Sequence, residues 1–289
     1  MPSTIDIRRR IRSVKNTQQI TKAMKMVAAA KLRRAQERIV AARPYAAGLR
    51  EVLESVVVRI DPDKHPLLAE RDDEKNVVVV VVTGDKGLAG AFNANVLKAT
   101  MNLLRENNWE NVELLPIGRK ANDFFKRRTI PIRKREGAQV LQALAPETAK
   151  EIADSLVTGY LNGELDAVYV VFNEYRSIIS QIVRVEKLLP FPRPEQDEAL
   201  PANEVEYLFE PGPEQILSEL LPKHIEFQLY RVLLESAAAE QGARMTAMEA
   251  ATKNASEMID ALTLNYNRIR QAAITKEIIE IVSGAAAQK

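Results

Sequence analysis

The sequence predicts one very long helix over about residues 3–60. No proline stands between Pro2 and Pro44, and no glycine comes before Gly48. Pro44 predicts a local kink inside the helix, and Pro62 marks its end. A helix of about 57 residues is about 85 Å long at 1.5 Å per residue. Because this exceeds the interior of a compact domain, we expect much of the helix to extend beyond one.

This predicted helix is strongly basic. The first fifty residues contain thirteen Lys and Arg against Asp6 and Glu37, a net +11, whereas the whole chain nets only +2 and the remainder therefore −9. A long basic face favours an acidic partner. Three interpretations remain open from the pattern alone: the helix binds an acidic protein, it binds nucleic acid, or it is a solvated face without a partner. Nucleic acid is disfavoured because no base-reading motif or aromatic stacking residues accompany the charges.

Apolar residues near both ends recur in alternating steps of three and four, the 3.5-residue period of a coiled coil. The two seams are Ile39, Ala42, Ala46, Leu49, Leu53 and Val56, and then Ala255, Ile259, Leu262, Tyr266, Ile269 and Ala273. We therefore expect the terminal helices to pair antiparallel, with the intervening chain inserted as a domain. The division is 1–60, 75–210 and 213–289. Pro222 predicts a break or kink before the main C-terminal helix, 224–284.

The middle part alternates strand and helix patterns, which predicts an open α/β sheet with helices on its faces. Residues 77–83 are an aliphatic run typical of a strand buried on both sides. Residues 180–188 alternate apolar and polar residues, as an edge strand does. Further strands are expected over 112–117, 130–133, 166–173 and 205–209, helices over 93–107, 120–128 and 146–161, and a loop over 190–203.

Several classes of site are excluded or disfavoured. The chain has no cysteine, which excludes disulfides, thiolate metal sites and thiol redox switching. His65 and His224 have no ligand-like spacing, so we expect no metal and no cofactor. The scattered Asp and Glu residues form no nucleophile–base or carboxylate pair. The longest aliphatic run is too short to cross a bilayer, and we expect the basic N-terminus to belong to the mature protein.

The turn over residues 84–90 follows a strand and precedes a helix, which raises a phosphate-binding hypothesis. Its sequence, TGDKGLAGAF over 83–92, is neither a P-loop nor a dinucleotide-binding fingerprint. We favour the alternative, in which the glycines satisfy the backbone geometry of a tight connection.

Three segments together closely resemble the gamma subunit of F-type ATP synthases. They are IRSVKNTQQITKAMKMVAAAK over 11–31, the turn over 83–93, and the stretch from EQGARM at 240–245 to RQAAIT at 270–275 and EIVSGAAA at 280–287. The similarity covers essentially the whole chain in order. It implies a long antiparallel coiled coil of N- and C-terminal helices with an inserted Rossmann-like open α/β sheet domain.

The resemblance also implies a role and partners. In that family the coiled coil is the rotor shaft inside a hexamer of three alpha and three beta subunits, and the globular end binds epsilon and the c-subunit ring. Proton or sodium flow turns ring and shaft, and the shaft drives each beta catalytic site in turn. The chain itself would catalyse nothing, occur once per complex, bind no nucleic acid, and lie peripherally at the cytoplasmic face of the bacterial plasma membrane.

Site residues follow from the motif match alone. The resemblance places one group against the beta subunit and another at the epsilon and c-ring end. The beta-contact residues are Met24, Lys25, Lys31, Arg33, Arg34, Arg244, Gln271 and Thr275, and the epsilon and c-ring residues are Tyr207 and Glu210.

The chain departs from the family pattern in the turn. Gly84, Ala89 and Ala91 replace a common Ser, Cys and Gly, so roles of those side chains do not carry over. The chain also lacks the cysteine-bearing insertion of chloroplast gamma subunits, which indicates a bacterial source. Two alternatives remain: a nucleotide-binding α/β enzyme with a helical oligomerisation arm, and a nucleic-acid-binding coiled coil.

Overall fold

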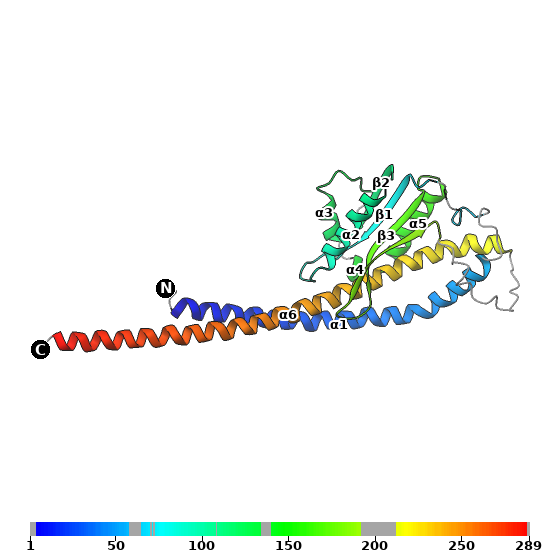
Figure 1. The fold of residues 1–289 in the computed structure, drawn as a ribbon. Helices are drawn as coiled ribbons and strands as arrows, with labels where there is room; N and C mark the ends of the chain where they lie inside the picture. Colours follow the sequence, from blue (N-terminus) through cyan, green and yellow to red (C-terminus); the bar gives the residue numbers. More distant parts are fainter. Residues whose placement is uncertain are drawn as a thin grey trace. The chain divides into compact units, whose positions relative to one another are not determined.

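The computed structural model describes residues 4–57, 65–69, 71, 73–107, 109–133, 140–191 and 212–287. Two long terminal helices, α1 (Thr4–Val57) and α6 (Pro213–Ala287), enclose a central α/β region in the sequence (Figure 1). The chain divides into an α/β unit, Ala29–Ala243, and a helical unit, Met1–Ala28 with Arg244–Lys289. Both terminal helices contribute to both units. The three-part division at 1–60, 75–210 and 213–289 stays a prediction.

The two long helices are confirmed, with 54 residues in α1 and 75 in α6. Pro44 lies inside α1 and Pro222 inside α6, so a break at Pro222 is wrong, while the alternative of a kink there stays a prediction. A proline removes one helical hydrogen bond and crowds the preceding turn. Leu221 and Ile225, on either side of Pro222, are fully buried. Each such side chain contributes about 1.5–3 kcal/mol, which offsets the cost of the proline.

The central sheet has four strands in the order β2-β1-β3-β4. Strand β1 is parallel to both of its neighbours, and β4 runs antiparallel to β3 at the edge. The open α/β sheet and its edge strand are therefore confirmed. The strands are β1 (Asn76–Val82), β2 (Asn111–Ile117), β3 (Ala167–Tyr175) and β4 (Gln181–Leu189).

Among the described residues, four shorter helices accompany the sheet: α2 (Phe92–Glu106), α3 (Arg119–Phe125), α4 (Val140–Ala143) and α5 (Pro146–Leu161). The sequence analysis did not anticipate α4. The strand expected over 130–133 is wrong, because only an isolated bridge joins Leu114 and Ile132. Pro131 has no N–H to extend a ladder. The expected strand 205–209 and the loop segment 192–203 lie outside the described residues.

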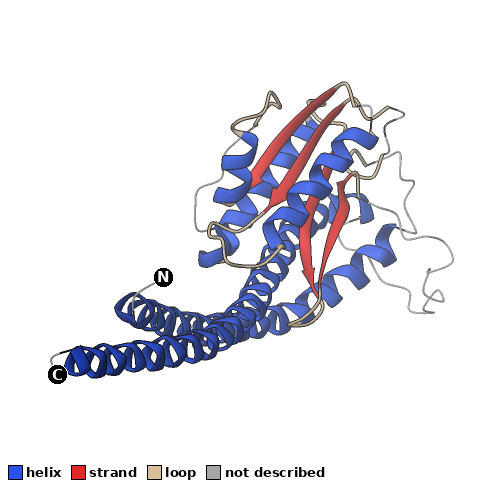
Figure 2. Ribbon diagram, turned by 60° about the vertical axis from the view of Figure 1, so that its left-hand side comes forward, coloured by secondary structure: helices blue, strands red, loops and turns tan. Residues whose placement is uncertain are grey.

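Strand β1 separates two apolar cores, and helices cover both faces of the sheet (Figure 2). Val78, Val80 and Val82 pack into a core formed with α1, α5 and α6. The alternate residues Val77, Val79 and Val81 pack with α2 and α3. Successive side chains of a strand point to opposite faces, which explains why an unbroken aliphatic run forms this strand.

A charged cluster also joins the sheet to α6 within the α/β unit. The Arg231 guanidinium pairs with Glu186 on β4 and lies 3.1 Å from the Glu235 carboxylate one helical turn further on. Burial raises the pKa of the Glu235 carboxyl, although Arg231 acts in the opposite direction. The cluster gives directional contacts to an interface that is otherwise mainly apolar.

Gly118 permits a close approach at the carboxyl ends of β1 and β2. Its φ is 89°, and a Cβ there would lie 1.9 Å from the carbonyl oxygen of Thr83. The Thr83 hydroxyl accepts a hydrogen bond from the Ala121 amide at 2.8 Å and donates to the Ile117 carbonyl at 3.2 Å. The start of α3 is thereby fixed against the end of β1.

We expect Gly118→Ala to destabilise the chain by about 3 kcal/mol or more, because both the positive φ and the contact with Thr83 oppose a methyl group. Gly163→Ala is the matched control, since Gly163 has φ 77° but no atom within 4 Å of an added Cβ. It should cost about 1 kcal/mol. Urea unfolding of the two full-length variants measures the difference, and equal costs would contradict the steric account.

Candidate functional site

In the helical unit the two terminal helices pair antiparallel. Residues further along α1 contact residues nearer the start of α6. Arg8 donates to the Tyr266 hydroxyl, Thr21 hydrogen-bonds Thr252 at 2.8 Å, and Lys25 pairs with Glu249 at 2.7 Å. The buried residues between the helices include Ala28, Met248 and Ala255. The small side chains of Ala28 and Ala255 let the two backbones approach closely.

Two of the predicted beta-contact residues, Met24 and Lys25, lie on α1 in this helical unit and are half-buried. Lys25 is already engaged with Glu249, a contact that is largely exposed and therefore weak, about 0–1 kcal/mol. Arg244, at the start of the α6 part of this unit, is also half-buried. These side chains are accessible from outside but are held by the helix pair.

Gln271 and Thr275 lie on a fully exposed stretch of α6. Every residue from 270 to 283 is exposed. The Thr275 hydroxyl donates to the Gln271 carbonyl at 2.9 Å, so the two lie one turn apart on the same side of the helix. Large apolar side chains are exposed along the same stretch, including Ile274, Ile278 and Ile281. Exposed apolar surface of this kind marks a protein-interaction site.

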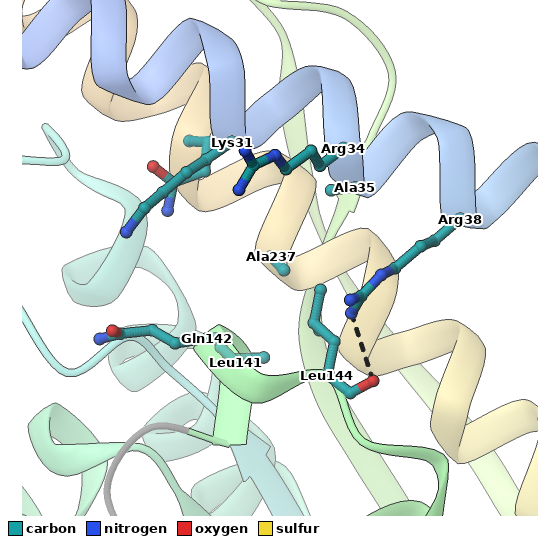
Figure 3. A pocket seen from close by; sticks show the side chains of 9 residues that line it. Lys31, Arg34, Ala35, Arg38, Leu141, Gln142, Leu144 and Ala237 are labelled. Carbon is teal, nitrogen blue, oxygen red and sulfur yellow. Dashed lines mark hydrogen bonds between the residues drawn. The ribbon is translucent and has the colours of Figure 1, made fainter.

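The remaining predicted beta-contact residues, Lys31, Arg33 and Arg34, are exposed on α1 within the α/β unit. Arg33 pairs with Glu37 one turn along, at 3.1 Å. Lys31 and Arg34 instead border a hollow of about 160 Å³ between α1, α6 and the α4 region. Figure 3 shows both side chains extending from α1 toward that hollow. The eight beta-contact residues therefore divide between the two units. Tyr207 and Glu210 lie outside the described residues.

Arg38 is a further basic residue at this hollow, and the sequence analysis missed it. Its guanidinium donates to the carbonyls of Ala143 and Leu144 at 3.3 and 3.4 Å, the end of α4 (Figure 3). A spacing of three and then four residues places Lys31, Arg34 and Arg38 on one face of α1. The spacing of these three residues can be recognised in the sequence, whereas helix α4, which lies opposite them, could not be predicted from it.

The turn after β1 does not support the phosphate-binding hypothesis. The Gly84 amide donates to Asn93 Oδ1 at 2.9 Å, and Asp85 accepts the Arg119 amide at 2.9 Å. The first backbone donor of the turn is thus occupied, and the carboxylate would repel an anion. The two glycines are needed for the backbone conformation and packing of the turn. A Cβ on Gly84 would lie 2.7 Å from the Glu240 side chain, and Gly90 has a positive φ of 55°. The alternative of a tight connection is confirmed.

The described residues lack two other kinds of feature. Within the described ranges, no three His, Cys, Asp or Glu side chains gather as metal ligands would. Likewise, none of the helices in the described part of the chain is long and apolar enough to span a membrane.

The fold and the exposed surfaces of α1 and α6 define a helical subunit of a larger protein assembly. A sequence model described as ATP synthase matches residues 3–288. The ATP synthase gamma chain of Solibacter usitatus is 53% identical over 99% of both chains. Those of Anaeromyxobacter sp. and Chlorobaculum tepidum are 52% and 49% identical over the full length of both chains. The chain belongs to the family of ATP synthase gamma chains.

Solved structures agree with this assignment. A chain of the Tetrahymena thermophila mitochondrial ATP synthase central stalk and c-ring is similar with a TM-score of 0.58 and 26% identity, covering 80% of this chain and 99% of that one. A chain of the Euglena gracilis mitochondrial ATP synthase, in an assembly of OSCP, F1 and c-ring, has a TM-score of 0.67 at 21% identity over 99% and 94%. The second likeness concerns the fold alone.

We expect Arg38→Met to loosen the end of α4, because two carbonyls lose a charged donor worth about 1.5 kcal/mol or more. Amide hydrogen exchange around residues 140–146 should accelerate by a factor of about ten. Arg33→Met removes the same charge from a side chain that is 82% exposed. In this control, hydrogen exchange of the amides around residues 140–146 should not change. Equal acceleration in both variants would assign the effect to net charge.

Proposed function

We propose that this chain is the central rotor shaft of a bacterial F-type ATP synthase driven by proton or sodium flow. Its partners are the hexamer of three alpha and three beta subunits, the epsilon subunit and the c-subunit ring. The shaft couples rotation of the ring to successive conformational changes of the beta catalytic sites. One copy serves each complex, and the chain reaches the cytoplasmic face of the plasma membrane only through that complex.

The observation that carries the proposal is the end of α6. Residues 270–283 form an exposed helix that displays isoleucines, a surface that is unfavourable in water and requires a covering partner. The chain is 53% and 49% identical to two ATP synthase gamma chains over nearly their full length, which identifies the ATP synthase as the assembly that supplies the covering partner. In this proposal the end of α6, with Gln271 and Thr275, lies inside the alpha–beta hexamer.

The chain itself is proposed to be non-catalytic. Its contribution is mechanical: long helices supply stiffness, and different side chains around α1 and α6 present a different face to each beta subunit. Met24, Lys25, Lys31, Arg33, Arg34 and Arg244 provide the charged and flexible contacts of that surface. Tyr207 and Glu210 are proposed to serve the epsilon and c-ring end.

Co-expression with alpha and beta subunits from the same source tests the proposal. We expect one copy of the chain to enter each hexamer and to stimulate ATP hydrolysis strongly, as measured by size analysis and ATPase assay. A well-formed hexamer that excludes the chain would refute the assignment. Specific ATP or NAD binding by the full-length chain alone would instead support the nucleotide-binding enzyme.

Alanine substitutions at Arg244, Gln271 and Thr275 test the proposed beta contacts. Gln271 and Thr275 are exposed, so folding should be unaffected. Each lost contact is worth about 1 kcal/mol or less, which predicts a several-fold fall in turnover of the reconstituted complex for the triple variant.

The matched control for this variant replaces Lys253, Asn254 and Glu257, three exposed residues of the same helix, by Ala. The control complex should turn over at the unmodified rate. Unchanged assembly and turnover in the Arg244, Gln271 and Thr275 variant would remove those residues from the contact surface.

A further inference from the structure

The hollow between α1, α4 and α6 contains cationic side chains without counter-charges. Lys31 and Arg34 border it from α1, and neither side chain makes an ion pair or hydrogen bond to any residue in the described part of the chain. Arg38 lies beside them and directs part of its guanidinium to the carbonyls at the end of α4. Three positive charges thus converge on one small space.

The Gln241 side chain provides a second observation. Gln241 on α6 also lines the hollow, and it is only 8% exposed. Its side chain has no hydrogen-bond partner among the described residues. The Gln241 amide is not among the fully buried side-chain groups that lack a partner, so it is open to the hollow and available as a donor to a small ligand there.

Nearby acidic groups are already engaged elsewhere. Glu37 pairs with Arg33 at 3.1 Å. Asp85 accepts hydrogen bonds from the Arg119 amide and from Gln142, which itself lines the hollow. The residues that line the hollow include three basic and no acidic side chains, so the lining carries a net positive charge.

We propose that this hollow binds a small oxyanion of the inorganic phosphate class. Lys and Arg side chains form short, charge-assisted hydrogen bonds to phosphate oxygens, and the Gln241 amide adds a donor from α6. Leu141, Leu144 and Ala237 line the remaining surface. The volume of about 160 Å³ far exceeds the roughly 10–15 Å³ that one water needs.

This site is separate from the rotor role and does not depend on it. It does bear on the surface around Lys31 and Arg34, because a bound phosphate would neutralise charges that are proposed to face an acidic subunit. Phosphate would then compete with a partner's carboxylate for the same donors.

Titration of the purified full-length chain with inorganic phosphate, at constant ionic strength, tests the site by calorimetry. The unmodified chain should bind phosphate saturably. Arg34→Gln should weaken binding about tenfold or more, as expected for one charge-assisted hydrogen bond. Gln241→Glu should do the same through repulsion. Arg33→Gln, which removes the same charge from the neighbouring position outside the hollow, should leave the dissociation constant within about twofold.

Three outcomes would overturn the proposal. One is the absence of saturable phosphate binding in the millimolar range. Another is equal weakening by Arg33→Gln and Arg34→Gln, which would indicate general charge screening. The third is binding of acetate but not phosphate, which would assign the donors to a partner's carboxylate. None of these results affects assembly with alpha and beta subunits, so the rotor proposal is tested separately.

Discussion

The burial of one face of β1 against the terminal helices is the interaction on which the rest of the α/β unit depends. Val78, Val80 and Val82 are fully buried in a single core with Leu53 of α1 and Leu221 of α6. In proteins most of the stability of a helix comes from tertiary packing of its apolar face rather than from propensity. A four-stranded sheet likewise needs its faces covered. Each part therefore requires the other, and strands and terminal helices form one cooperative unit.

Much of this arrangement can be predicted from sequence because its signals are local and periodic. The aliphatic run of β1 and the two heptad-like seams identify a buried strand and a helix pair without any structure. The helix does not break at Pro222, since a local rule states the cost of a proline but not the packing of Leu221 and Ile225 that offsets it. The four-residue helix α4 has too few residues for any periodic signal.

The candidate site shows the same limit. The spacing of Lys31, Arg34 and Arg38 already places three charges on one face of a helix. What lies opposite them comes from α4, more than a hundred residues later, and from Gln241 on α6. Sequence alone therefore reveals a basic face but not the hollow that gathers it. The beta-contact roles proposed for Gln271 and Thr275 rest only on the resemblance to gamma subunits, since an exposed polar pair on a helix carries no signal of its own.

A turning subunit requires strong contacts within itself and weak contacts with its surroundings. Within the α/β unit the sheet is held to α1 and α6 by fully buried side chains, each worth about 1.5–3 kcal/mol, so torque can pass without slippage. The proposed outer contacts are exposed charges and single apolar residues, each worth about 1 kcal/mol or less. Salt screens them, and none is deep enough to trap one orientation. The position of the basic residues, on the surface rather than buried in pairs, thus follows from the same physical requirement as the apolar core.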